Sequence, residues 1–235
     1  MPSSTGPSSD TRGRVFLLSP ANCGGRRGSL LLGPSARFEL ARRLREPAGV
    51  PLGEVFSFVS GLYFRGKLTY ARRFAAPDDG GATPRVLVIT PTAGLQRPET
   101  SVTASILAEY ASVDVSAENS AYRLPLETSA RALDVVSRDR DVVLLGSIAT
   151  PKYVEVLTGI FGARLQFPAA FVGRGDMSRG GLLLRHAAAG VELEYVAVAG
   201  AVRRGPRPPK LPPQLSPELP PQRQARVPTS RPLGR

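Results

Sequence analysis

Val15-Phe16-Leu17-Leu18-Ser19-Pro20-Ala21-Asn22 decides the fold, because four consecutive apolar residues run directly into a small polar loop. The pattern returns in Val86-Leu87-Val88-Ile89 before Thr90-Pro91-Thr92, and in Val142-Val143-Leu144-Leu145 before Gly146-Ser147-Ile148-Ala149-Thr150. Continuous apolar runs of this length are typical of strands buried on both faces, as in parallel α/β sheets. Ligands of such sheets bind just beyond the carboxyl ends of the strands. The three loops therefore predict the position of a ligand site without naming its ligand.

Strand and helix patterns alternate between residues 14 and 202, which predicts one α/β domain with a largely parallel central sheet flanked by helices. Residues 1–13 are rich in Ser, Pro, Thr and Gly, and we expect them to be disordered. Residues 203–235 form a Pro- and Arg-rich tail, and ten of the 23 prolines lie between Gly205 and Arg235. Because proline at this density prevents helix and ladder formation, the tail is also expected to be disordered.

Apolar spacing and turn residues predict the individual elements. The expected strands are 15–19, 86–90, 141–145, 165–172 and 191–199. A helix capped by Ser35 and stopped by Pro47 follows the first strand. A second helical region covers 52–74 with interruptions near Gly61 and Gly66. Further helices are expected at 103–110, at 126–137, from a Thr150-Pro151 start to about Phe161, and from an Asp176 cap through His186 to Gly190.

The formal net charge of +12 is divided unevenly along the chain. Residues 201–235 carry +7, so the remaining 200 residues carry only +5, and much of the attraction to polyanions belongs to the tail. Cys23 and His186 are the only cysteine and histidine, which excludes an intramolecular disulfide and a four-ligand Cys/His zinc site. No metal and no cofactor are expected. The apolar stretches are too short to span a membrane and the N-terminus lacks a signal-peptide pattern, so a cytoplasmic protein is expected.

Three loops contain residue types that bind phosphate. The first runs from Asn22 to Gly28, where glycines permit close approach of backbone amides and two arginines could grip phosphate oxygens, although a surface loop explains it equally well. The second joins a strand to a helix between Gly146 and Tyr153, with ordinary helix capping by Thr150 as the competing interpretation. The third surrounds a helix start between Phe171 and Gly181, where Asp176 could be only a cap. The candidate ligand-binding residues are Ser19, Asn22, Arg26, Arg27, Ser147, Thr150, Lys152, Arg174, Asp176 and Arg179.

The stretch Ser60–Lys67 places the aromatic pair Tyr63 and Phe64 beside the basic residues Arg65 and Lys67. Aromatic faces next to cations suit unstacked bases, although the two rings fit a protein core better. Arg65, Lys67, Arg203 and Arg204 are the candidate nucleic-acid contacts. For Cys23 and His186 we favour a passive thiol and a packing or capping role over catalysis.

Four of these patches, taken in order, resemble the bacterial peroxide-stress YaaA family and related uncharacterised bacterial α/β proteins. They are Leu18-Ser19-Pro20-Ala21, Ser60-Gly61-Leu62-Tyr63, the third strand with Ser147–Tyr153, and Arg174–Arg179, together about 30 of 235 residues. The chain has Asn22 where the family has lysine, Phe64 where it has glycine, and Asp176 where it has leucine. The resemblance implies an intracellular α/β protein linked to DNA binding and protection from oxidative damage.

The leading hypothesis is a cytoplasmic α/β protein that binds a phosphate-containing ligand, a nucleotide or a nucleic acid, at its strand-end loops, with a role in DNA protection or stress response. DNA or RNA and a nucleotide-like small molecule are the expected partners, and a membrane is not. One alternative is an enzyme acting on a nucleoside or nucleotide, with Asp176, Glu54 or Glu155 as a general acid or base. Another is an interaction module whose Pro-rich segment 206–213 docks on an aromatic groove.

Overall fold

A six-stranded sheet with the order β4-β3-β1-β6-β7-β8 forms the centre of the computed structural model, which describes residues 13–75, 84–209 and 211. β1 (Val15–Leu18), β3 (Val86–Ile89), β6 (Val142–Leu145) and β7 (Leu165–Pro168) are parallel to one another. β4 (Leu95–Gln96) and β8 (Tyr195–Ala197) pair antiparallel at the two edges. The expected α/β fold with a largely parallel sheet is confirmed.

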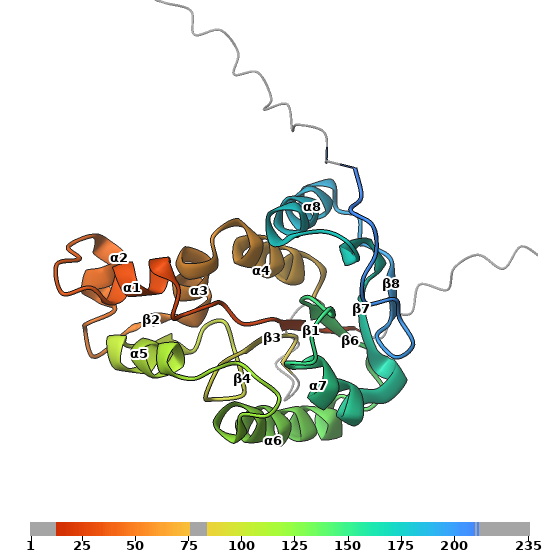
Figure 1. Cartoon of the computed structure of the whole chain (residues 1–235), viewed down its shortest axis with the longest axis horizontal. Coiled ribbons are helices and arrows are strands. Elements are labelled where there is room, and N and C mark those ends of the chain that lie inside the picture. The colour runs from red at the N-terminus through yellow and green to blue at the C-terminus, as the bar shows by residue number, and fades with distance from the viewer. Residues whose placement is uncertain (1–12, 76–83, 210, 212–235) are drawn as a thin grey trace, which may run out of the picture.

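Helices cover both faces of this sheet (Figure 1). One face carries α4 (Leu62–Phe74) and α8 (Asp176–Ala189), and the other carries α6 (Ser120–Val136) and α7 (Val154–Phe161). The remaining elements are α1 (Arg26–Leu32), α2 (Glu39–Arg43), α3 (Leu52–Ser60), α5 (Ala104–Ser112), the 3₁₀ turns η1 (Gly162–Arg164) and η2 (Ala169–Phe171), and the antiparallel pair β2 (Val50–Pro51) and β5 (Ser101–Val102).

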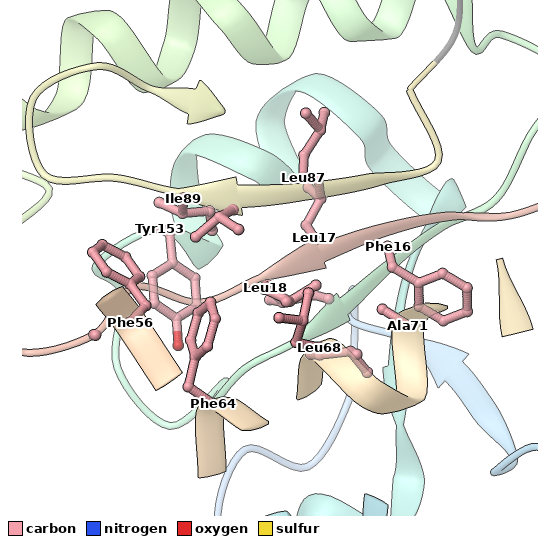
Figure 2. Packing of buried hydrophobic residues seen from close by; sticks show 14 of the residues in the cluster. Phe16, Leu17, Leu18, Phe56, Phe64, Leu68, Ala71, Leu87, Ile89 and Tyr153 are labelled. Carbon is pink, nitrogen blue, oxygen red and sulfur yellow. The ribbon is translucent and has the colours of Figure 1, made fainter. Parts of the chain in front are cut away.

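The side chains of β1 show why a continuous apolar run is needed at the centre of the sheet. All four residues of β1 are fully buried. Leu17 points to one face together with Leu87 of β3, while Phe16 and Leu18 point to the other face, toward α4 (Figure 2). Since both faces are covered, neither set of positions tolerates polar residues.

β1 also marks the place where the order of strands reverses. The chain passes from β1 to β3 on one side and later returns to β6 on the other side, so the connections that follow β1 and β6 lead in opposite directions. In open α/β sheets the crevice at such a reversal is the usual position of a ligand. Ser19 and Gly146, the residues directly after β1 and β6, lie at this crevice.

The packing of α4 against α8 depends on two glycines. A Cβ atom at Gly66 would lie 2.7 Å from the carbonyl oxygen of Gly180, and one at Gly180 would lie 2.8 Å from the carbonyl oxygen of Leu62. Gly66 therefore allows close helix packing and does not interrupt α4. The interruption expected near Gly61 is confirmed, because Gly61 separates α3 from α4 with a φ of 60°.

Several expected boundaries are wrong for local reasons. Ser35 caps no helix, because the glycine-rich loop enters α1 at Arg26 and Phe38 precedes α2. α6 begins six residues before Leu126, since its first turns accommodate Pro125. Thr150 does not start α7, which begins at Val154 after turns through Pro151 and Lys152.

Three other boundaries lie close to their expected positions. α5 begins at Ala104, beside its expected start at Thr103, which caps it through its side chain. Gly190 ends α8 in a left-handed conformation, as expected. Asp176 is the first residue of α8 and not its cap, which is Gly175.

After β8 the described chain forms no further helix or strand up to residue 209. It still packs on the domain, since a Cβ at Gly173 would lie 2.1 Å from the carbonyl oxygen of Pro206, and Leu211 packs against the core. Most of the expected tail, and residues 1–12 of the expected disordered N-terminal segment, lie outside the described residues. In the described part of the chain no helix has the length and apolar character needed to cross a membrane.

Candidate functional site

A cavity of about 690 Å³ opens at the carboxyl ends of β1, β3 and β6. All three strand-end loops that the sequence singles out reach it, through Ser19–Gly24, Pro91 and Ser147–Tyr153, and Asp176 at the start of α8 completes one side. Its volume lies within the range of about 300–1,000 Å³ that small-molecule sites occupy. The lining residues are Ser19, Pro20, Ala21, Asn22, Cys23, Gly24, Ser60, Tyr63, Pro91, Tyr110, Ala111, Ser112, Val113, Asp114, Val115, Ser147, Thr150, Lys152, Tyr153 and Asp176.

Ser19 is the point where the sheet meets this cavity. Its backbone N–H continues the sheet by donating to the carbonyl oxygen of Leu145, at 3.2 Å. Its side chain lies above Lys67 of α4, whose Nζ donates to Ser19 Oγ at 2.9 Å and to the carbonyl oxygen of Ser19 at 2.6 Å. Ser19, which lines the cavity, thus has its hydroxyl hydrogen-bonded to a buried lysine.

Lys67 is 0% exposed, which is unusual for a lysine. Its Nζ lies 4.5 Å from the ring centroid of Tyr63 and 4.9 Å from that of Phe64. Burial lowers the pKa of Lys67 from 10.5 to about 7, and the influence of Asp176, which raises it, is opposed by Arg179. The amine is thus populated in both protonation states near neutral pH.

Gly146 allows the second wall of the site to approach Ser19. A Cβ at Gly146 would lie 2.9 Å from Ser19 Cβ and 2.9 Å from the hydroxyl of Tyr153. The Tyr153 hydroxyl donates to the carbonyl oxygen of Ser147 at 2.9 Å. Burial raises the pKa of Tyr153 to about 12, with the nearby Ser19 hydroxyl partly opposing the rise, so the phenol stays protonated. Figure 2 shows the Tyr153 ring together with Phe56 and Phe64 near the end of β1.

Tyr63 provides a third buried hydroxyl at the cavity. Within the described part of the chain its oxygen forms no hydrogen bond of normal geometry, and Arg179 lies near enough only to oppose the rise in its pKa that burial causes. A buried hydroxyl without a partner is destabilising unless a ligand or water satisfies it. Tyr63 is one of the residues that line the cavity.

The polar rim of the cavity contains Asn22, Ser147, Thr150 and Lys152, with the carboxylates of Asp114 and Asp176. Lys152 and Thr150 are exposed, so their groups can reorient toward a ligand. Of the three carboxylates considered as a general acid or base, only Asp176 lies here. Glu54 is paired with Arg43 at 2.7 Å, and Glu155 lies on another part of the surface beside Arg123 and Arg131.

The four arginines expected to bind phosphate do not line this cavity. Arg26 and Arg27 are exposed on α1, and Arg27 donates to the carbonyl oxygen of Phe58 at 3.2 Å. Arg174 donates to the carbonyl oxygen of Ala170 at 3.0 Å and to Ser178. The buried Arg179 donates twice to the carbonyl oxygen of Phe171, at 3.2 Å each, and pairs with Asp176. Of the five basic residues expected to hold phosphate, Lys152 is the one that the structure places at the cavity rim.

Of the four residues expected to contact nucleic acid, three are exposed and one is buried. Arg65, Arg203 and Arg204 are exposed, but Lys67 is turned into the core and cannot present its charge to a polymer at the surface. Tyr63 and Phe64 belong to the core, which agrees with the expectation that the two rings fit a protein core better than a surface for stacking bases.

Neither Cys23 nor His186 shows an activating environment. Burial raises the pKa of Cys23 to about 12, which agrees with a passive thiol. His186 Nδ1 lies 3.0 Å from the carbonyl oxygen of Val191 at the end of α8, as a capping or packing residue would. Among the described residues no group of three His, Cys, Asp or Glu side chains is arranged to hold a metal ion.

Sequence reasoning missed the relation between Ser19 and Lys67, which are 48 positions apart. The available signal was a lysine on the apolar face of a helix, four residues after Tyr63 and three after Phe64. A lysine at such a position is as compatible with a buried amine as with a surface charge.

The fold and the site together define a mixed α/β protein with a cavity at the strand ends, where the central sheet reverses its order. Comparison with family models, with curated proteins and with solved structures finds no match for this chain. The resemblance to the YaaA family therefore stays a prediction.

Proposed function

We propose that the protein binds a small phosphate-bearing ligand of the mononucleotide class in the cavity between Ser19, Ser147 and Asp176. The observation that carries this proposal is the convergence of three strand-end loops, far apart in the sequence, on one cavity. Lys152 supplies the positive charge for the phosphate at the rim, and the hydroxyls of Ser147 and Thr150 supply donors beside it.

A second set of lining residues suits a flat, partly apolar group. Pro20, Ala21, Val113 and Val115 offer apolar surface, and Tyr110 offers an aromatic ring. The carboxylates of Asp114 and Asp176 can accept hydrogen bonds from sugar hydroxyls or from amino groups of a base. Phosphate, sugar and base thus each find complementary groups, which a free inorganic anion would not use.

Calorimetric titration of the full chain with adenosine, guanosine, cytidine and uridine monophosphates, with their nucleosides and with inorganic phosphate tests this proposal. We expect one monophosphate to bind at least about tenfold more tightly than its nucleoside, because the phosphate adds a charge-assisted contact. Lys152→Gln should remove that difference. Arg138→Gln is the matched control, since Arg138 is exposed near the amino end of β6, away from the cavity. Equal affinity of wild type and Lys152→Gln for every monophosphate would contradict the proposal.

A second candidate is contact with DNA or RNA through the exposed Arg65, Arg203 and Arg204. Such contact supplies attraction that depends on salt and not on sequence. Binding of labelled single-stranded DNA by the full chain should then weaken in an Arg203→Gln, Arg204→Gln double variant, with a smaller salt slope. A double variant with an unchanged salt slope would remove this candidate and leave the mononucleotide alone.

The proposed ligand implies a cytoplasmic protein, since free nucleotides are cytoplasmic metabolites. A role in DNA protection depends on the second candidate, contact with DNA or RNA. Docking through the Pro-rich segment 206–213 rests on residues that lie only in part within the described chain. The enzymatic alternative names Asp176, Glu54 or Glu155 as a general acid or base, and of these Asp176 lines the cavity.

A further inference from the structure

The buried face of the cavity contains a reactive arrangement that ligand binding alone does not require. Ser19 Oγ is within hydrogen-bond distance of an amine that is wholly enclosed by protein, and Ser19 itself lines the cavity. The second hydrogen bond, from Lys67 Nζ to the carbonyl oxygen of Ser19, fixes the amine beside this hydroxyl. In the Nζ hydrogen bonds that the structure describes, both acceptors belong to Ser19.

We propose that Ser19 and Lys67 form a serine–lysine catalytic pair that hydrolyses an ester or amide of the ligand by acyl transfer through Ser19. The identity of the substrate as a phosphate-bearing small molecule rests on the function proposed above, whereas the reactivity of the pair does not. A serine is a weak nucleophile until a neighbouring base takes its proton, and a desolvated lysine is one of the known bases for this purpose.

The reaction balances with water as the only co-reactant. The neutral Lys67 amine takes the proton of Ser19 Oγ while Oγ bonds to the carbonyl carbon. The bond from that carbon to the leaving oxygen or nitrogen then breaks, and the leaving group takes the proton from the Lys67 ammonium. Water, deprotonated by the same amine, then bonds to the acyl carbon of the ester on Ser19. The bond from that carbon to Ser19 Oγ breaks, Oγ takes the proton back from the Lys67 ammonium, and the acid leaves.

The surroundings of Lys67 support a base near neutral pH. The aromatic rings of Tyr63 and Phe64 cover the amine, and burial is the main cause that brings its pKa to about 7. The charged groups that influence it are Asp176 and Arg179, both from α8, and they act in opposite directions. Tyr63 and Tyr153, the nearby phenols, have pKa values raised by burial and stay neutral, so they do not compete for the proton near pH 7.

Tyr63 also provides a donor for the charge that develops on the carbonyl oxygen. Tyr63 lines the cavity, and its buried hydroxyl forms no hydrogen bond of normal geometry among the described residues. A donor that is already fixed in a water-poor site stabilises such a charge without reorganisation. We assign it this role in the proposed reaction.

Diisopropyl fluorophosphate tests the pair without requiring the natural substrate. In this reaction Ser19 Oγ bonds to phosphorus, fluoride leaves, and Lys67 takes the proton. Mass spectrometry of the full chain, followed by peptide mapping, should show one adduct on Ser19. The labelling rate should rise as Lys67 loses its proton and level off above a pH of about 7. The absence of a Ser19 adduct between about pH 6 and 9, or a rate that climbs with hydroxide without levelling off, would overturn the proposal.

Variants separate a catalytic lysine from a structural one. Ser19→Ala should abolish the adduct, and Ser29→Ala, at an exposed serine of α1, should leave it unchanged. Lys67→Arg keeps the charge but supplies no base, so labelling should slow by about 100-fold in a folded protein. If Lys67 had a purely structural role, Lys67→Arg would be labelled at the wild-type rate, and this result would contradict the proposal. The pH profile of the wild-type protein remains decisive if the Lys67 variants do not fold.

The two proposals fail separately. Because the probe is uncharged, labelling of Ser19 does not depend on phosphate recognition by Lys152. Labelling without mononucleotide binding would keep the catalytic pair and overturn the proposed ligand. Mononucleotide binding without labelling would do the reverse.

Discussion

Lys67 Nζ lies 2.9 Å from Ser19 Oγ and is held there by a second hydrogen bond of 2.6 Å to the Ser19 carbonyl oxygen. Helix α4, which packs on one face of the sheet, thus places the Lys67 amine beside Ser19, the residue directly after β1. Because the amine is buried, its effects reach beyond the cavity to the stability of the whole domain.

The burial of Lys67 predicts that the protein becomes more stable as pH rises above 7. Its pKa is about 7 in the folded state against 10.5 ordinarily, so between these values the unfolded chain binds one more proton than the folded chain. The free energy of unfolding should therefore rise with pH, by up to about 1.4 kcal/mol per pH unit. Urea unfolding between about pH 7 and 8.5 measures this slope, in a range that lies below the ordinary pKa of 9.0 for Cys23.

Lys67→Met should remove this slope, and Lys152→Met, at an exposed lysine on the cavity rim, should retain it. A slope that survives in Lys67→Met would show that another group causes it. Above about pH 10 the opposite trend is expected, because Cys23 and the buried tyrosines hold their protons longer in the folded state and together outweigh Lys67.

Gly146→Ala should destabilise the protein by about 1–3 kcal/mol, because the added methyl group would lie 2.9 Å from both Ser19 Cβ and the Tyr153 hydroxyl. Gly159→Ala is the matched control. Gly159 lies within α7 and a Cβ there has no neighbour within 4 Å, so alanine should stabilise by about 0.5–1 kcal/mol. Thermal unfolding of both variants gives the comparison. Equal effects of the two substitutions would mean that the end of β6 is not closely packed.

The contact between α4 and α8 gives a similar test with adjacent glycines. Gly180→Ala places a methyl group 2.8 Å from the carbonyl oxygen of Leu62 and should destabilise by about 1–3 kcal/mol. Gly181→Ala meets only the side chain of Leu211, at 3.8 Å, and should stabilise α8 by up to about 1 kcal/mol. Denaturant midpoints of the two variants should be measured under the same conditions. A lower midpoint for Gly180→Ala than for Gly181→Ala indicates close helix packing, whereas equal gains in both would reflect helix propensity alone.

Two buried tyrosines differ in the partners of their hydroxyls. Tyr70 lies 2.5 Å from the Tyr195 hydroxyl and accepts from the backbone N–H of Leu193 at 2.7 Å. Tyr70→Phe leaves that N–H unsatisfied and should destabilise by about 1–3 kcal/mol. Tyr122→Phe removes a buried hydroxyl without a partner in the described chain, so it should be neutral or stabilising. Chemical unfolding of both variants checks the difference, and a larger loss in Tyr122→Phe would contradict it.

The sheet and the position of the site were predictable from sequence because the two depend on local patterns. Three apolar runs of four residues gave the central strands, and their loops do reach one cavity through Ser19, Pro91 and Ser147. Thr103 and Gly190 are recognisable helix ends for the same reason, since a cap depends on a few neighbouring residues.

Side-chain direction was not predictable, because it depends on tertiary packing. Lys67 is buried where α4 meets Ser19 at the end of β1, and Arg179 is buried against the carbonyl oxygen of Phe171, so neither charge lies at the surface. Gly66 and Gly180 make the close approach of α4 and α8 possible, but a single glycine in a helix pattern also fits a break, as expected wrongly for Gly66. Thr150-Pro151 has the composition of a helix start, yet the chain makes further turns there before α7 begins.

Amide chemical-shift mapping of the full chain during titration with a nucleoside monophosphate tests the central claim most directly. We expect saturable shifts concentrated in the segments that line the cavity, which are Ser19–Gly24, Tyr110–Val115, the loop from Ser147 to Tyr153 and the start of α8 around Asp176. Shifts that appear instead around the exposed Arg65 and Arg203, with none at the segments that line the cavity, would contradict the proposed site.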